Sequence, residues 1–391
     1  MRRLFLLVSA VVLVDTAFYA AISPLLPHYQ AEFGLTKAAA GVLTASYAAG
    51  TLIGSIPAGW AAGRIGVKRT LLLGLGLMSV TSVIFGFAHH VLLLDAARFL
   101  QGVGGACSWA AGMAWLVSGA PYERRGELIG SAIAAAIVGV MLGPVLGGAA
   151  TVVGPEVVFG AVAVAGAGLA AWAFTTPGVP PGEPLGFRVV LGSLRRRPVA
   201  IGFWLMLIPA VFSGVLEVLA PLRLHALGAS GAGVAAVFLV AAIGEAVASP
   251  IAGRLSDRRG RLMPIRIGLV AAVVMAVLLP LPGTVALMAL VLFAAVASLG
   301  TFWAPAQALL ADASDQAGLA QGLAFALANL AWSGGHVIGG SAGGALAQAT
   351  TDAVPYGILA LITAGTVVLL AQPSRVAARP QAPQGSTPSL R

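Results

Sequence analysis

The sequence contains few charged residues. Asp, Glu, Lys and Arg make up 9% of its 391 residues, whereas a soluble globular domain carries about 25%. The deficit runs along the whole chain, in which 59% of the residues are hydrophobic. A helix that spans a bilayer needs about 20 mostly apolar residues. The composition therefore predicts a membrane protein throughout, rather than a soluble domain with one anchor.

The sequence also lacks the motifs of several enzyme classes. Its single cysteine, Cys107, excludes an internal disulfide and a cysteine metal cluster. It contains no Walker loop, no HExxH motif and no dinucleotide-binding fingerprint. We therefore predict no bound metal and no cofactor, and ATP-driven transport is not indicated.

Twelve apolar segments are predicted to span the membrane as helices. They cover residues 4–26, 41–62, 70–89, 92–117, 127–150, 156–175, 199–220, 232–252, 263–282, 284–306, 318–346 and 354–372. The many small residues, including 51 glycines, suit close packing of helices in lipid. The expected fold class is an all-α polytopic membrane protein with twelve transmembrane helices.

The basic residues predict the orientation of the chain. Lys37 and Arg223 fall in loops on the far side of the membrane from the N-terminus, and Arg98 lies within a span. The rest of the 22 Lys and Arg residues fall on the N-terminal side. Because basic loops stay in the cytoplasm, both termini are predicted to be cytoplasmic. The high pI thus reflects topology, so no nucleic-acid partner is expected. The short outer loops favour a bacterial inner (plasma) membrane.

Residues 176–198 form the longest connection and divide the spans six and six. We expect an N-terminal half over 1–175, a cytoplasmic linker over 176–198 and a C-terminal half over 199–372. Residues 373–391 are rich in Pro, Ser and Gln, which predicts a disordered tail.

The two halves contain similar segments. GWAAGRIGVKR (59–69) and GRLSDRRGRL (253–262) each follow the second span of a half. Gly143-Pro144-x-x-Gly147-Gly148 returns 196 residues later as Gly339-Gly340-x-x-Gly343-Gly344. An internal repeat in a polytopic chain is typical of a transporter whose site lies between its repeats.

The segment GRLSDRRGR (253–261) resembles the loop motif G-x-L-x-D-R-x-G-R of the major facilitator superfamily. The resemblance implies two pseudo-symmetric six-helix halves and a latch that closes the cytoplasmic gate. The first copy departs from the motif because Gly63 replaces the aspartate. The residues assigned to the gate are Gly59, Arg64, Gly253, Asp257, Arg258, Gly260 and Arg261.

Two further segments resemble family motifs. Arg98-Phe-Leu-Gln101-Gly-Val-Gly resembles the fourth-span R-x-x-Q-G-x-G pattern. The fifth span matches the pattern found in drug:proton antiporters, through Gly130, Gly139, Gly143, Pro144, Gly147 and Gly148. We expect this glycine pattern to form a smooth, kinked helix that packs closely across the two halves.

Other spans are similar to those of tetracycline exporters and vesicular amine transporters. The first span (13–27) resembles both groups, and Leu216-Glu217-x-x-x-Pro221 resembles the seventh span of the amine branch. Residues 328–344 resemble its eleventh span, but Asn329 stands where that branch has an aspartate.

Four charged residues within or near spans are candidates for proton coupling or cation binding: Asp15, Arg98, Glu217 and Glu245. A charge inside a bilayer is costly unless it is paired or hydrated, so such residues are often functional. For Asp15 the alternative is a structural ion pair, and for Arg98 it is pairing with nearby Asp95. Glu217 could simply be an interfacial residue in contact with water. Glu245 could pair with a cytoplasmic-side arginine.

Aromatic and polar residues are candidates for lining a cavity. Asn329, Trp332 and His336 fall on one face of the eleventh span, and Tyr19 and Gln101 are further candidates. A packing stripe is the alternative. Phe18, Tyr19, Trp109, Phe302 and Trp303 could stack on a flat or cationic ligand.

The function expected from these features is proton-coupled export of small lipophilic or cationic compounds by a monomer, driven by the proton gradient. One alternative is a major facilitator importer or symporter of a polar metabolite. A remote alternative is an intramembrane serine hydrolase, because Gly339-Gly-Ser341-Ala-Gly343 spells G-x-S-x-G and His336 lies nearby.

Overall fold

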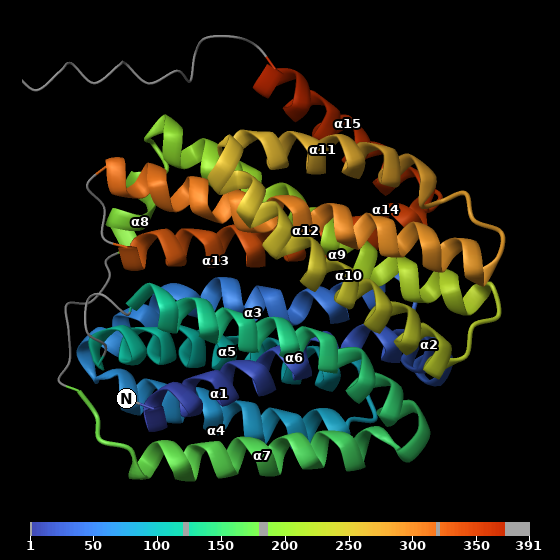
Figure 1. Ribbon diagram of the computed structural model, residues 1–391. Helices are drawn as coiled ribbons and strands as arrows, with labels where there is room; N and C mark the ends of the chain where they lie inside the picture. The colour runs from blue at the N-terminus through green and yellow to red at the C-terminus, as the bar shows by residue number, and fades with distance from the viewer. Residues whose placement is uncertain (1, 120–124, 180–186, 318–320, 372–391) are drawn as a thin grey trace, which may run out of the picture.

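The computed structural model describes residues 2–119, 125–179, 187–317 and 321–371, which form a bundle of long helices (Figure 1). The predicted tail (373–391), residue 372, residues 318–320 of the eleventh predicted span and part of the predicted linker (180–186) lie outside the described residues. In Figure 1 the N-terminal end of α1 and the C-terminal end of α15 lie toward the same side of the bundle.

The first six predicted spans form what we call the N-terminal set. Its helices are α1 (Arg2–Ala20), α2 (Ile22–Phe33), α3 (Lys37–Arg64), α4 (Val67–Gly86), α5 (Val91–Gly119), α6 (Arg125–Val153) and α7 (Pro155–Thr175). Together α1 and α2 make up the first span, which is broken at Ala21.

The last six predicted spans form the C-terminal set. Its helices are α9 (Arg197–Ala226), α10 (Gly231–Arg259), α11 (Leu262–Leu278), α12 (Val285–Gln316), α13 (Gln321–Val337), the π-helix η2 (Ile338–Ala342), α14 (Gly343–Ala349) and α15 (Ala353–Ala371). The short helix α8 (Phe187–Ser193) lies in the predicted linker. The eleventh span is thus made of α13, η2 and α14.

Within the described residues, each predicted span therefore coincides with one or more helices, and the all-α fold class is confirmed. Within the described ranges, nine helical segments are long and apolar enough to cross a membrane by length and composition. Helix α11 is shorter, with 17 residues, and α5 contains Asp95, Arg98 and Gln101, which lower its hydropathy. The boundaries of the two halves stay a prediction.

Local sequence explains where several helices begin. Thr36 and Ser230 are extended N-cap residues whose side chains accept hydrogen bonds from Ala39 N and Gly233 N. These two caps open equivalent helices, α3 and α10. The loops that end them contain Gly66 and Gly260, whose φ angles of 93° and 87° favour glycine.

The break in the first span follows from Pro24. Proline has no backbone N–H and its ring clashes with the carbonyl of the fourth residue before it, here Ala20. Helix α1 ends at that residue. The carbonyl oxygens near the end of α1 therefore need other partners.

The two sets pack in the same pattern. In the N-terminal set α1 packs on α6, α3 on α5, and α4 on α5 and α7. In the C-terminal set α9 packs on α13, α10 on α12, and α11 on α12 and α15. Helices α6 and α10 meet between the sets, as do α3 and the α13–α14 segment. The internal repeat of the sequence is thus a repeat of helix pairings.

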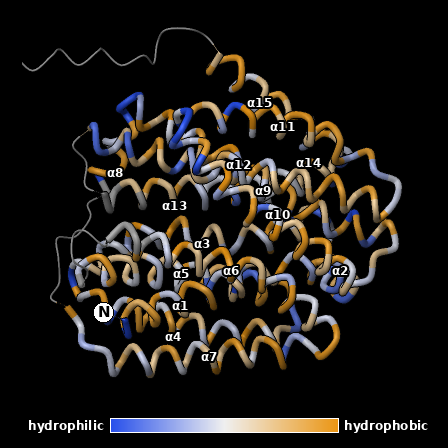
Figure 2. Tube along the Cα trace, in the orientation of Figure 1, coloured by the Kyte–Doolittle hydropathy of each residue, from blue (hydrophilic) through white to orange (hydrophobic). Residues whose placement is uncertain are grey.

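The outer surface of the bundle is apolar. Long stretches of α4, α7, α11 and α15 are hydrophobic, whereas hydrophilic segments gather near α8 (Figure 2). Val164 on α7 and Leu361 on α15 are examples of fully apolar side chains that are largely exposed. A surface of this kind suits contact with lipid acyl chains.

Candidate functional site

Asp15 of α1 is buried in the middle of the bundle, with 1% of its surface exposed. Its Oδ2 atom accepts hydrogen bonds from the Tyr47 hydroxyl at 2.9 Å and from Trp109 Nε1 at 3.1 Å. The Oδ1 atom is buried without a hydrogen-bond partner among the described atoms. Both donors to Oδ2 are neutral side chains, so they do not cancel the charge of the carboxylate. Because Oδ1 has no partner, that oxygen remains available for a proton or a cation.

Gly105 of α5 makes room for this arrangement. A Cβ atom there would lie 2.5 Å from the Tyr47 hydroxyl and about 3.1 Å from Asp15 Oδ1. A larger residue would therefore push apart the two side chains that hydrogen-bond to each other.

Arg98 of α5 is fully buried and caps the broken first span. Its Nη2 atom donates to Tyr19 O at 3.1 Å, and its Nη1 atom donates to Phe18 O at 3.4 Å. Nη1 also donates to Gln101 Oε1 at 2.9 Å. The negative end of a helix dipole attracts a cation. Because Arg98 binds the end of α1, the alternative of an Arg98–Asp95 pair is wrong.

Aromatic rings surround the Arg98 guanidinium. Its Cζ atom lies 5.2 to 6.0 Å from the ring centroids of Tyr47, Phe18, Tyr19 and Phe85. Such contacts attract a cation through the faces of the rings. They help a buried cation to persist where an isolated one would be costly.

Glu217 of α9 joins the two sets of helices. Its carboxylate accepts the Tyr19 hydroxyl, at 2.7 Å from Oε1 and 2.9 Å from Oε2. Oε1 also lies 3.6 Å from His336 Nε2. With 21% of its side chain exposed, Glu217 is held in a polar contact between α1 and α9. The alternative of a merely interfacial, water-bound glutamate therefore does not describe it.

The eleventh span presents its predicted face to the N-terminal set. The Trp332 ring lies 5.2 Å from Tyr19 and 4.5 Å from His336. Asn329 Nδ2 donates to Ser55 Oγ of α3 at 2.6 Å. Asn329 thus forms a neutral polar link between the two sets, at the position where the vesicular amine transporters that this span resembles have an aspartate.

Glu245 of α10 approaches the same region. A Cβ atom on Gly300 of α12 would lie 2.9 Å from the Glu245 Cγ atom, so the glycine admits this side chain between the helices. Glu245 interacts electrostatically with Glu217 and His336. Both of these groups belong to the C-terminal set, and no ion pair between Glu245 and an arginine is found among the described residues.

The predicted gate residues lie away from this buried group. Arg261 donates to Asp257 at 2.7 Å and to Asp312 of α12 at 3.1 Å. The hydrogen bond to Asp312 is the main cause that raises the pKa of the Arg261 guanidinium. Its contacts with Asp257 and Asp312 tie α10, α11 and α12 together within the C-terminal set.

The other gate residues lie near the C-terminal ends of α3 and α10 or directly after them. Gly260 caps α10, and Arg258 lies in the last turn of that helix. In the first copy Arg64 stacks on the Trp60 ring at 5.2 Å. Gly253 has open space where a Cβ would be. Gly59 lies in α3 at the position equivalent to Gly253.

The glycine pattern of α6 packs mainly within its own set, which corrects the expectation of packing across the halves. A Cβ on Gly139 would overlap Thr16 and the Leu13 carbonyl, both of α1. Gly143 and Gly147 meet Ala20 and Ala21 at the break of the first span. Pro144, between them, is also buried.

Only part of the pattern reaches the other set. A Cβ on Gly148 would lie 2.7 Å from the Ala235 side chain of α10. Gly130, the first glycine of the pattern, has open space around its Cβ position. The pattern therefore lets α6 pack against the broken span, and Gly148 alone of these glycines meets the C-terminal set in the described contacts.

The serine-hydrolase alternative has no geometric basis. Ser341 lies in η2, and its hydroxyl donates to Val337 O at 2.5 Å. His336 instead contacts Trp332 O and Glu217. The glycines around Ser341 repeat the packing of α6, since a Cβ on Gly343 would lie 2.8 Å from Val215 of α9.

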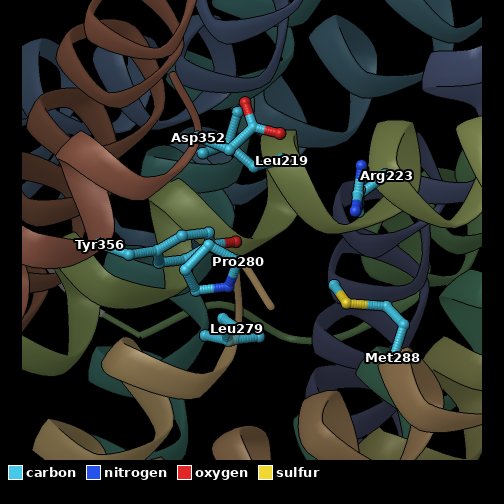
Figure 3. Close-up of a pocket in the computed structure, with 7 residues that line it drawn as sticks. All are labelled: Leu219, Arg223, Leu279, Pro280, Met288, Asp352 and Tyr356. Carbon is cyan, nitrogen blue, oxygen red and sulfur yellow. The ribbon is translucent and has the colours of Figure 1, made fainter. Parts of the chain in front are cut away.

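A second link between the sets lies at the end of the bundle where α3 begins. Lys37 Nζ lies 2.5 Å from Asp352 Oδ1, and Lys37 N donates to Gln348 Oε1 at 3.1 Å. Asp352 and Arg223 also line a small pocket at this end, together with Tyr356 (Figure 3). The pocket is separate from the buried group around Asp15.

Tyr47 is the main residue of the buried group that sequence reasoning missed. It lies in the middle of α3 and binds Asp15, and its ring lies 4.9 Å from that of Tyr19. A tyrosine among small residues in a span is a weak pattern by itself. Its role depends on the crossing of α1, α3 and α5, which the sequence does not specify.

Comparisons with known proteins agree with the fold. The human Synaptic vesicular amine transporter (Homo sapiens) is 28% identical over 328 residues, which are 79% of this chain and 61% of that protein. Multidrug resistance protein 2 of Bacillus subtilis is 29% identical over 147 residues, 38% of this chain and 37% of that protein. The matched regions thus span less than two thirds of each of these relatives.

A solved structure shows the same fold at low identity. The D-xylose-proton symporter aligns with a TM-score of 0.74 and 17% identity, over 95% of this chain and 97% of that one. The family described as Major Facilitator Superfamily matches residues 7–225 and, again, 210–390. These two matches together cover most of the sequence, and the chain therefore belongs to the major facilitator superfamily.

Proposed function

We propose that this chain is a secondary transporter that exports small lipophilic or cationic compounds in exchange for protons. The observation that carries this proposal is Asp15, a buried carboxyl group with one unbonded oxygen beside a group of aromatic rings. A carboxylate in such a place binds either a proton or a cation, and opposite preferences for one site are enough to couple their movements.

Two further features support export. The fifth-span glycine pattern resembles that of drug:proton antiporters, and it positions α6 against the broken first span. Two relatives carry the names Multidrug resistance protein 2 and Synaptic vesicular amine transporter. Tyr19, Tyr47 and Trp332 provide ring faces that suit a flat or cationic compound.

In this mechanism the two sets of helices rock about the central site and open it to one side at a time. A compound from the cytoplasm binds beside Asp15 and displaces its proton. The protein then opens outward, and reprotonation of the carboxyl group releases the compound. The proton gradient drives the cycle without a cofactor.

The same proposal places the protein in a bacterial inner membrane, as a monomer with both termini in the cytoplasm. The basic residues Arg195–Arg197 and those of the α10–α11 loop support this orientation. Lys37 and Asp352 then lie at the outer end.

The test uses protein reconstituted in liposomes and the permanent cation tetraphenylphosphonium, followed by a wider panel of dyes, amines, tetracyclines and phenicols. We expect Asp15→Asn to abolish proton-driven efflux while insertion is retained. Asp95→Asn is the matched control, because Asp95 is a partly buried carboxylate of α5 outside this group. Unchanged proton exchange in Asp15→Asn would remove Asp15 from the mechanism. Movement of the compound and protons in the same direction across inside-out vesicles would favour symport.

A further inference from the structure

The geometry of the contact between Glu217 and His336 indicates which ring nitrogen of His336 carries a hydrogen. His336 is buried, with 5% of its side chain exposed, and its Nδ1 atom lies 2.9 Å from Trp332 O. A carbonyl oxygen only accepts hydrogen bonds, so Nδ1 must carry a hydrogen. The ring orientation that makes this bond also turns Nε2 toward Glu217 Oε1, 3.6 Å away.

With Nδ1 protonated, a neutral imidazole has a lone pair on Nε2. That lone pair would then face an ionised carboxylate, which is unfavourable in a site with little water. One added proton removes the conflict, whether it resides on Nε2 as imidazolium or on Glu217 as carboxylic acid. Both forms of the pair have zero net charge, which is the state that a bilayer interior favours.

We propose that Glu217 and His336 form a proton-binding site that holds one proton between the two side chains and does not include Asp15. Its link to transport rests on the proposed function above, whereas the existence of the shared proton does not.

The packing fixes the pair in this geometry. A Cβ on Gly335 would overlap Ala210 of α9, and one on Gly339 would overlap the Val211 carbonyl. A Cβ on Gly214 would lie 2.9 Å from His336 O. Backbone contact between α9 and α13–η2 thus sets the spacing of Glu217 and His336. The π-helical turn begins two residues after His336, and such turns are frequent at functional sites.

Other titratable groups face the pair from the neighbouring helices. They are Tyr19 of α1, which donates to Glu217; Glu245 of α10; Tyr47 of α3, next to Trp332; and Arg98 of α5, next to Tyr19.

Charged residues of two other neighbouring helices lie away from the pair. Helix α12 also packs on α13, but its acids Asp312 and Asp315 lie near its C-terminal end, where Asp312 binds Arg261. In α8 the charged residue is Arg188, which is exposed.

Asp15 has a different set of partners. Its hydrogen bonds come from Tyr47 and Trp109, whereas Glu217 is bound by Tyr19 and faces His336. The two carboxyl groups therefore belong to different sets of helices, with the rings of Tyr19 and Tyr47 between them. Protons on the two sites can be exchanged by different events.

The experiment is nuclear magnetic resonance of protein in lipid nanodiscs with ¹⁵N in the histidine rings. The chain has five histidines, and the His336 signals are those that His336→Asn removes. We expect Nδ1 to stay protonated across the pH range while the Nε2 signal changes. The pH profile of Nε2 should differ in Glu217→Gln and match the wild type in Asp15→Asn.

Three results would overturn the proposal. They are a bare Nδ1 atom, an Nε2 profile that Glu217→Gln leaves unchanged, and a profile that Asp15→Asn alters as much as Glu217→Gln does. These readouts need no substrate, so they stand even if tetraphenylphosphonium is not exported.

The role in transport has its own readout. If wild-type protein exports tetraphenylphosphonium, His336→Asn should flatten the dependence of the efflux rate on pH while Glu217 still binds Tyr19. An unchanged pH dependence in His336→Asn would separate the shared proton from transport.

Discussion

The ion pair between Lys37 and Asp352 should bias the protein toward the state that is closed at this end of the bundle. It joins the start of α3 to the loop before α15, and thus one set of helices to the other. Opening at this end requires the two charges to separate. Replacing either charge, in Lys37→Gln or Asp352→Asn, should therefore increase the population that is open there.

The magnitude follows from exposure. The two side chains are 33% and 23% exposed, so solvent screens the pair and its contribution lies in the range of about 0.2–1 kcal/mol. That range corresponds to roughly a 1.4- to 5-fold change in the ratio of open to closed protein. The effect is limited because the bond from Lys37 N to Gln348 and the close contact of Gly344 with Lys37 O remain in both variants.

The assay measures distances between spin labels at Ala31 of α2 and Ala353 of α15, which are exposed, after Cys107 is replaced by serine. The double variant Lys37→Gln/Asp352→Asn completes a double-mutant cycle. If the charges act on each other, the double variant opens the end no further than either single variant.

Two outcomes would refute this reasoning. One is a distance distribution that neither single variant changes. The other is full additivity of the two single variants, which would mean that the charges do not interact. Arg223→Gln serves as a comparison, because Arg223 lines the same pocket as Asp352 (Figure 3) but is hydrogen-bonded to Pro282 O within its own set.

Three further predictions concern the packing and the loops. Arg98→Lys should lower the free energy of unfolding by about 1–3 kcal/mol, because a lysine cannot satisfy both carbonyls at the end of α1; thermal melting in detergent checks this, with exposed Arg64→Lys as the control. Gly139→Ala should reduce stability by about 1–3 kcal/mol through overlap with α1, whereas Gly130→Ala should leave melting unchanged. Asp312→Asn should change the free energy of unfolding by less than about 1 kcal/mol, because its ion pair with Arg261 is partly exposed to solvent. Equal melting temperatures of the two alanine variants, or a large loss in Asp312→Asn, would contradict these expectations.

The sequence alone predicted the fold because the membrane restricts the possible structures. Runs of apolar residues must form helices in lipid, where every backbone group needs an internal partner. The 196-residue offset between Gly143 and Gly339 further predicted that the halves repeat. In the structure these glycines occupy equivalent positions, against α1 and α9 respectively. Periodicity and spacing therefore carried most of the architecture.

The site was predicted less completely, because side-chain pairing depends on how helices cross. The spacing of Asp95 and Arg98 made a pair between them plausible. The structure instead uses Arg98 to cap α1, because Pro24 breaks the first span beside it. Likewise the α6 glycines were expected to contact the other half, yet most of them contact α1. Neither partner could be identified without the relative placement of α1, α5 and α6.

The broken first span gives Tyr19 two connections that lie in different sets of helices. Its carbonyl oxygen accepts Arg98 of α5, and its hydroxyl donates to Glu217 of α9. A movement of α9 relative to α1 must therefore either break the hydroxyl contact or pull on a residue whose backbone Arg98 holds. If Glu217 is protonated by the pair with His336, it becomes a weaker acceptor for the Tyr19 hydroxyl than the carboxylate. A proton on the C-terminal set would thus loosen the contact that joins it to the N-terminal set, which links the protonation state of Glu217 to the relative movement of the two sets.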